Sequence, residues 1–215
     1  MVIETRVIRV LTADDHPLLR SGIRTLIATQ PDMQLVGEAS SGTEVVQLHR
    51  ELRPDVTLMD LQMPDMSGVD AIIAIRSEQP AARIAVLTTY SGDVLARRAL
   101  MAGAQAYVLK SMARAEILDT IRAVHAGERR IQTDVAAGIA IHAADVPLTA
   151  REIEVLRLVA TGHANKTISA RLAINEETTK THVKNILAKL GAKDRTHAVS
   201  LGLKRGIFSL EPQPR

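Results

Sequence analysis

The chain has 215 residues, long enough for one large or two small domains, and 46% of them are hydrophobic, which suits ordinary globular cores. It contains no cysteine, which excludes disulfide bonds, thiolate metal sites and cysteine nucleophiles. Its only aromatic residues are Tyr90, Tyr107 and Phe208, so a single-stranded nucleic-acid site built on base stacking is not expected.

Membrane insertion and secretion are not expected either. Residues Met1 to Val10 lack the apolar core of a signal peptide. The longest weakly polar stretch, Val135 to Ala144, is far shorter than the roughly 20 residues of a membrane-spanning helix. The composition therefore predicts a cytoplasmic protein that does not enter a membrane.

Charge is distributed unevenly along the chain. Residues 1–146 carry 15 Lys and Arg against 18 Asp and Glu, whereas residues 147–215 carry 12 against 6. An acidic front part and a basic back part indicate different partners, and the basic part suits a polyanion. The alternative is solvated charge that happens to be scattered unevenly.

From Arg6 to about Ala126, short apolar runs alternate with segments of helical periodicity. The predicted strands are Arg6–Thr12, Met33–Ala39, Asp55–Met59, Arg83–Thr88 and Gln105–Leu109. The predicted helices are Leu18–Thr29, Glu44–Leu52, Val69–Ser77, Val94–Met101 and Arg114–Ala126. This alternation predicts an α/β fold with a doubly wound parallel sheet. The flavodoxin-like (βα)5 strand order 2-1-3-4-5 places strands 1 and 3 side by side, with ligands beyond their carboxyl ends.

Polar side chains stand at the carboxyl ends of four of these strands, and therefore at one edge of the sheet. They are Asp14 and Asp15, Asp60, Thr88 and Lys110. Clustered carboxylates repel one another unless a cation lies among them, and oxygen ligands with water suit Mg²⁺. Asp60 is a candidate acceptor of a phosphoryl group. Lys110 would neutralise charge on the transferred oxygens, and Thr88 would donate a hydrogen bond to them.

Taken singly, these residues have simpler explanations. Asp14 and Asp15 could merely cap a helix that starts at Pro17. Thr88 and Lys110 could be ordinary loop residues. Their joint placement at successive strand ends favours a phosphoryl-transfer site.

Four segments carry a resemblance to a known family. They are Ala13–Pro17, Asp60–Gly68, Leu87–Tyr90 and Gly103–Lys110. With these segments, residues 5 to about 126 resemble a two-component receiver domain. Ser111 departs from the pattern, since many receivers have proline after the lysine.

The resemblance to receivers implies a role for each site residue. Asp60 would be the phospho-acceptor, and Thr88 and Tyr107 would form a switch pair in which the ring turns inward when Thr88 moves toward the phosphate. A sensor histidine kinase would be the partner. The implied Mg²⁺ ligands are Asp15, Asp60, the backbone carbonyl of Gln62 and, through water, Asp14.

The strand pattern ends before the last third of the chain. Residues 1–127 are predicted to form the receiver, and residues 128–146 a linker with one helix over Asp134–Ala143. Residues 147–215 are predicted to form an all-α domain of about four helices. These helices are Thr149–Thr161, Lys166–Leu172, Glu176–Leu190 and Arg195–Gly206.

The third of these helices is amphipathic. Its apolar stripe consists of Val183, Ile186, Leu187 and Leu190. Lys180, Thr181 and Lys184 lie on another flank, and Asn175 is a plausible N-cap. The preceding helix ends a few residues earlier, so the pair reads as a helix-turn-helix whose second helix enters the DNA major groove. A merely solvated lysine face is the alternative.

A second resemblance covers residues 147 to about 208. It rests on Leu148–Glu152, Val155-Leu156, Ala160–Gly162, Asn165-Lys166, Ile168, Leu172, Thr178–Val183, Ile186, Lys189–Gly191 and Asp194–Thr196. These residues resemble the LuxR-type helix-turn-helix of the NarL/FixJ response-regulator subfamily. The resemblance implies that Lys180, Thr181 and Lys184 contact DNA, with Lys166 and Arg171 near its backbone.

Two details of this helical domain follow from the pattern. Thr149 and Glu152 fit a capping box at the start of the first helix. Thr179 stands where the family usually has valine, and its helical angle points it at the core with a hydroxyl to satisfy.

Together, the two resemblances predict a response regulator that binds double-stranded DNA as a homodimer and is controlled by phosphorylation. It is not expected to be an enzyme, except that it assists its own phosphorylation and dephosphorylation. Two alternatives remain. A Mg²⁺-dependent phosphohydrolase would carry a second aspartate two residues after the nucleophile, where Gln62 stands. A LuxR-type regulator with a small-molecule pocket would not need the intact set of site residues.

Overall fold

The computed structural model describes residues 7–89, 92–112 and 114–208. Arg6 and Tyr90, which belong to predicted segments, lie outside the described residues, as do the first residues of the first predicted domain and the last residues of the second. The chain divides into two compact units, one formed mainly by residues up to 136 and one by residues 92–95 and from 137 onward. Among the described helices, none combines the length and apolarity needed to cross a membrane.

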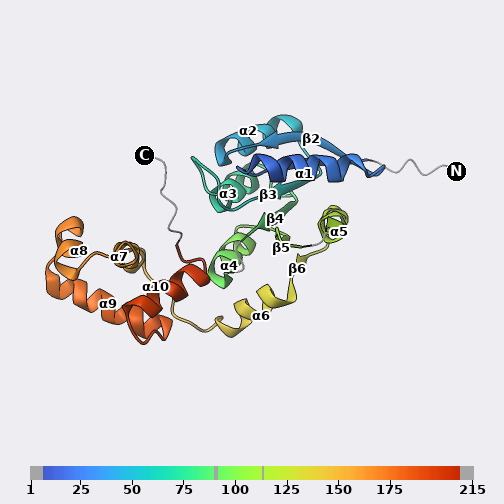
Figure 1. The fold of residues 1–215 in the computed structure, drawn as a ribbon. Helices are drawn as coiled ribbons and strands as arrows, with labels where there is room; N and C mark the ends of the chain where they lie inside the picture. The colour runs from blue at the N-terminus through green and yellow to red at the C-terminus, as the bar shows by residue number, and fades with distance from the viewer. Residues whose placement is uncertain (1–6, 90–91, 113, 209–215) are drawn as a thin grey trace. The chain divides into compact units, whose positions relative to one another are not determined.

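The first unit is built on a six-stranded parallel sheet with the strand order β2-β1-β3-β4-β5-β6 (Figure 1). The strands are β1 Ile8–Ala13, β2 Met33–Ala39, β3 Val56–Met59, β4 Ile84–Thr88, β5 Ala106–Leu109 and β6 Arg130–Ile131. The helices are α1 Pro17–Ala28, α2 Gly42–Leu52, α3 Gly68–Glu78, α4 Asp93–Met101 and α5 Arg114–His125. The predicted order 2-1-3-4-5 is confirmed, and the sheet continues by one strand that the sequence analysis missed.

Local capping explains where several helices begin. The Ser41 side chain accepts a hydrogen bond from the Glu44 amide at the start of α2, and Ser67 does the same for Asp70 at the start of α3. In α1 the N-cap is His16 and Pro17 is the first helical residue. Neither Asp14 nor Asp15 is therefore the cap, so the simpler explanation for these two aspartates is wrong.

The two faces of the sheet are covered by different helices. Ile23 and Ile27 of α1 and Ile121 of α5 share one buried cluster with Val10 and Leu58 of the central strands. Because successive strand residues point to opposite faces, the intervening residues of the same strands face away from α1 and α5. On that other side, His49 of α2 contacts Thr57 of β3.

The sixth strand lies in the segment predicted to be a linker. Arg130 and Ile131 pair in parallel with Ala106 and Tyr107 of β5. The Gln132 side chain then accepts a hydrogen bond from the backbone amide of Leu109 at 3.2 Å. Helix α6, Thr133–Ile141, follows where the linker helix was predicted. The start of the segment predicted as a linker is thus tied to the edge of the sheet before helix α6 begins.

The second unit contains the helices α7 Ala150–Ala160, α8 Asn165–Leu172, α9 Glu176–Leu190 and α10 Arg195–Lys204, as predicted. Their shared core includes Leu156, Ile168 and Ile186. The predicted capping box of Thr149 and Glu152 is present at the start of α7.

The turn between α8 and α9 is tight. Ala173 ends α8 in the left-handed conformation, with φ of 51°, and the Asn175 side chain accepts a hydrogen bond from the Thr178 amide at 2.6 Å. The predicted N-cap is therefore confirmed. Two helices joined in this way form the helix-turn-helix that the sequence predicted.

His49 is a titratable group in the core of the first unit. Its residue is 2% exposed, and its Nδ1 lies 3.1 Å from Thr57 Oγ1. Burial lowers the pKa of the imidazole from its ordinary 6.5, and this outweighs the nearby Gln79 side chain and the charge of Glu78, which favour the protonated form. Below pH 6.5 the unfolded state thus binds more protons than the folded state does. The free energy of unfolding therefore decreases as the pH is lowered.

We therefore predict that the free energy of unfolding of the first unit declines as pH drops below about 6.5, by at most about 1.4 kcal/mol per pH unit for one proton. His49→Asn should flatten this decline. The measurement is urea unfolding followed by tyrosine fluorescence in the full chain, because both tyrosines precede residue 128. The effect of the substitution on the folded structure alone is measured above pH 7.5, where His49 is neutral in both states. If the free energy of unfolding of the variant declines at low pH as steeply as that of the wild type, the prediction is contradicted.

Candidate functional site

The predicted polar residues meet at the carboxyl edge of the sheet. Asp14 follows β1, Asp60 follows β3, Thr88 ends β4 and Lys110 follows β5. The Asp60 amide donates to the Ala13 carbonyl at 2.8 Å, which sets the ends of β1 and β3 side by side. We call Asp14, Asp15, Asp60 and Lys110 the acidic edge.

The Lys110 ammonium joins two carboxylates of the acidic edge. Its Nζ lies 2.7 Å from Asp14 Oδ2 and 2.7 Å from Asp60 Oδ2. The three side chains are only 8%, 2% and 4% exposed, so little water screens these charges. The arrangement connects three strands through one cation.

The same contacts determine the pKa shifts at the site. Burial raises the pKa of the Asp60 carboxyl, and the bond to Lys110 opposes that rise without cancelling it. Burial alone would lower the pKa of Lys110, but its hydrogen bonds to Asp14 and Asp60 raise it. The ammonium is thereby fixed in its charged form at neutral pH.

The second oxygen of Asp60 is held by the loop that follows. Asp60 Oδ1 accepts a hydrogen bond from the Leu61 amide at 2.7 Å. The loop returns to the site because the Gly68 amide donates to the Leu61 carbonyl at 3.0 Å. A Cβ on Gly68 would lie 2.0 Å from the Asp60 backbone oxygen, so only glycine allows this approach.

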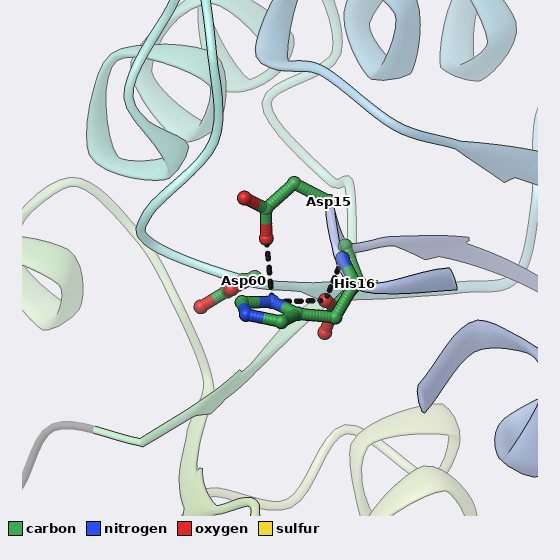
Figure 2. A group of neighbouring side chains, drawn as sticks. Asp15, His16 and Asp60 are labelled. Carbon is green, nitrogen blue, oxygen red and sulfur yellow. Dashed lines mark hydrogen bonds and ion pairs between the residues drawn. The ribbon is translucent and has the colours of Figure 1, made fainter. Parts of the chain in front are cut away.

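Asp15 and His16 form the outer part of the site. The Asp15 side chain is 39% exposed, and His16 Nδ1 lies 2.7 Å from Asp15 Oδ1 (Figure 2). One ligand atom each from Asp14, Asp15, His16 and Asp60 lies within 4.8 Å of the others. The two buried carboxylates and the exposed one provide oxygen donors, and the exposed side leaves space for water. Carboxylate oxygens together with water are the ligands that fit a hard divalent cation.

His16 was not predicted to belong to this cluster. Its position directly after two aspartates was the available signal, but a helix N-cap usually directs its side chain to the helix amides. Here the His16 amide donates to Asp14 Oδ1 at 2.9 Å, and the ring lies beside Asp15.

The other residues named by the resemblance to receivers lie on β4, on β5 and in the loops beside the site. Thr88 and Tyr107 are both 0% exposed, and the Thr88 carbonyl accepts from the Lys110 amide at 2.8 Å. Burial raises the pKa of the Tyr107 hydroxyl, and the charge of Asp60 adds to the rise. Gln62 is half-buried in the loop after Asp60. None of the described peptide bonds is cis, including that between Lys110 and Ser111.

In the second unit, one side of helix α9 is buried in the core and another side is exposed and basic. Lys180, Thr181 and Lys184 are exposed, whereas Thr179 is 0% exposed and directs its hydroxyl to the Asn175 carbonyl at 3.4 Å. Lys166 and Arg171 on α8 are exposed as well. The predicted DNA-contact residues are therefore available on the surface of this unit.

A buried ion pair in the second unit was missed. Lys189 Nζ lies 2.7 Å from Glu152 Oε2, whose side chain is 4% exposed. Because α7 and α9 are far apart in sequence, no local pattern indicates that these two side chains meet.

Each part of the chain matches a known protein family. Residues 10–122 match the response regulator receiver domain, and residues 146–201 match the bacterial regulatory proteins of the luxR family. The chain belongs to the two-component response regulators. It combines a receiver domain with a LuxR-type helix-turn-helix and is a DNA-binding transcriptional regulator.

Full-length relatives share both parts of this regulator. The transcriptional regulatory protein LiaR of Bacillus subtilis (strain 168) is 43% identical over 199 residues, which cover 89% of this chain and 94% of LiaR. The response regulator protein VraR of Staphylococcus aureus (strain NCTC 8325 / PS 47) is 40% identical over 206 residues, or 94% and 99% of the two chains.

Solved structures resemble the regulator over most of its length. ChrA, a response regulator of a heme-sensing two-component system, is 32% identical with a TM-score of 0.57, and the alignment covers 94% of this chain and 99% of ChrA. A structure of two RcsB dimers bound to two parallel DNAs is 25% identical with a TM-score of 0.67, covering 93% and 99% of the chains.

The close approach of Gly68 to Asp60 leads to a prediction. Gly68→Ala should destabilise the first unit by about 1–3 kcal/mol, because the loop after Asp60 must shift to admit a methyl group. Gly22→Ala is the matched control: it lies within α1, a Cβ there meets nothing within 4 Å, and alanine should stabilise the unit by about 0.5–1 kcal/mol. Urea unfolding followed by tyrosine fluorescence measures both; equal effects of the two substitutions would contradict the prediction.

Proposed function

We propose that Asp60 accepts a phosphoryl group from a sensor histidine kinase or a small phosphodonor, and that this modification controls transcription through the helix-turn-helix. The observation that carries the proposal is the placement of Asp60: a buried carboxylate with one oxygen on Lys110 and the other on the Leu61 amide. A carboxylate oriented in this way can attack phosphorus, and the bond from phosphorus to the donor breaks.

The acidic edge fits Mg²⁺ as the metal of this reaction. Asp14, Asp15 and Asp60 supply oxygen donors, and the Gln62 backbone carbonyl belongs to the loop beside them. Bound Mg²⁺ would neutralise charge on the phosphoryl oxygens. Lys110 does the same from the buried side, since its ammonium already touches Asp60.

Thr88 and Tyr107 are the proposed switch pair. Thr88 ends the strand next to that of Asp60 and can donate its hydroxyl to a phosphoryl oxygen. Tyr107 is fully buried, which is compatible with the inward ring position that we assign to the switched state. Phosphorylation then needs to shift a two-state equilibrium by only a few kcal/mol.

The output part of the proposal concerns DNA. We assign residues 1–127 to the receiver, 128–146 to the linker and 147–215 to the DNA-binding domain. In the last of these, Lys180, Thr181 and Lys184 of α9 would lie in the major groove of double-stranded DNA and reach base edges and phosphates, with Lys166 and Arg171 near the DNA backbone. The phosphorylated regulator would bind as a homodimer, since two copies place two such helices on neighbouring half-sites.

Asp60→Asn is predicted to abolish phosphorylation by acetyl phosphate and Mg²⁺, because the amide cannot form the acyl phosphate. Phosphate-affinity electrophoresis measures the modified fraction. The matched control is Asp65→Asn in the same loop: Asp65 is exposed and has φ of 67°, a conformation that asparagine also adopts. Phosphorylation that persists in Asp60→Asn would refute Asp60 as the acceptor, and equal loss in Asp65→Asn would point to damage of the loop.

Lys184→Ala is predicted to weaken DNA binding and to reduce the slope of log affinity against log salt by about one, as expected for one lost phosphate contact. Fluorescence anisotropy with a promoter fragment measures the slope. Lys204→Ala is the matched control, because Lys204 is an exposed lysine at the end of α10 and has no assigned contact. An unchanged slope in Lys184→Ala would exclude this lysine from the interface.

A further inference from the structure

A carboxylate lies among the proposed DNA contacts of helix α9. We call Lys180, Thr181 and Lys184 of this helix the basic flank. With about 100° of rotation per helical residue, Glu177 lies within about 60° of all three around the helix axis. The buried Thr179 and Ile186 lie about 160° and about 180° from Glu177. Glu177 therefore points away from the core of the second unit, in the middle of the exposed side of α9.

Glu177 is held only weakly by its neighbour. Its Oε2 lies 3.3 Å from Lys180 Nζ, and the two side chains are 77% and 54% exposed. Water screens such a surface pair, so it contributes little to stability. When the Lys180 ammonium turns to a DNA phosphate, the Glu177 carboxylate loses its counter-charge and faces the DNA.

A carboxylate beside DNA is repelled by the phosphates unless a base donates a hydrogen bond to it. In the major groove the donors are the amino groups of cytosine and adenine, whereas guanine and thymine present acceptors. Glutamate is suited to cytosine N4, and glutamine to the N6 and N7 atoms of adenine. Glu177 is the second residue of α9, and the first residues of a recognition helix are those that contact base edges.

We propose that Glu177 is a specificity-determining residue, which accepts a hydrogen bond from cytosine N4 at one position in each half-site of the DNA. Guanine and thymine are rejected at that position, because their acceptor atoms would face the carboxylate. The inference rests on the proposed placement of α9 in the major groove. It goes beyond that placement because it assigns a base preference to a residue outside the basic flank.

Glu177→Gln is the decisive variant, because glutamine retains the length and the helix propensity of glutamate but is suited to adenine. Binding of the full chain to a pool of double-stranded DNA with randomised sequence, followed by sequencing of the bound fraction, gives the base preference at each position. The wild type should select cytosine at one position of each half-site. The variant should select adenine there, with the other positions unchanged.

Fluorescence anisotropy with the selected DNA, and with the same DNA carrying adenine at that position, gives the size of the effect. The wild type should prefer cytosine by at least about fivefold, the lower end for a specific base contact, and Glu177→Gln should lose or reverse this preference.

Glu176→Gln is the matched control. Glu176 is also exposed and lies in the same first turn of α9, so both substitutions remove one negative charge at the same helix N-terminus. Glu176 lies about 100° from Glu177 around the axis, farther from the middle of the exposed side. Its substitution should change the affinity for all sequences alike. A uniform change in Glu177→Gln as well, or an equal shift in base preference in both variants, would overturn the proposal.

Lys184→Ala separates this inference from the proposed function. If Lys184→Ala lowers the salt slope but Glu177→Gln keeps the wild-type preference, only the role of Glu177 fails. If neither variant has its expected effect, the placement of α9 in the groove is wrong and the inference falls with it. If only Glu177→Gln has its expected effect, the role of Glu177 stands and the phosphate contact of Lys184 fails.

Discussion

The contact of one lysine with two aspartates holds the receiver site together. The Lys110 ammonium lies 2.7 Å from both Asp14 and Asp60, and these residues follow three different strands. Removing one partner of a buried ion pair typically costs about 3–5 kcal/mol, because the remaining charge stays buried without compensation. Here the loss of the lysine would leave two neighbouring carboxylates to repel each other. The stability of the sheet edge and the chemistry of the site therefore depend on the same cation.

Burial of the partner also distinguishes two lysines of helix α9 in the helix-turn-helix. Lys189 is paired with the buried Glu152 and ties α9 to α7, so it is structural. Lys180 lies 3.3 Å from Glu177, but both side chains are mostly exposed, and such surface pairs contribute about 0–1 kcal/mol. Lys180 can therefore exchange its partner for a DNA phosphate at little cost. Burial thus distinguishes a lysine that is held within the domain from one that stands on its surface.

The sequence predicted the fold and the meeting of the polar side chains at one sheet edge, because both follow from patterns along the chain. Parallel strands bring their carboxyl ends to one edge, so Asp14, Asp60 and Lys110 could be grouped before any distance was known. The missed features depend on tertiary pairing. The strand Arg130–Ile131 has two residues and therefore no readable period, and the pair of Glu152 and Lys189 joins helices that are distant in sequence.

The missed strand has a consequence for how the receiver connects to the linker. Ile131 pairs with Tyr107, and Gln132 accepts from the amide of Leu109, the residue directly before Lys110. The linker is thus bonded to the short strand that carries the proposed switch residue and leads to the site lysine. A change in the position of β5 must alter these two contacts or move the linker with it. Through the pairing of β5 with β6, the strand that leads to Lys110 and the segment that follows α5 are therefore held together.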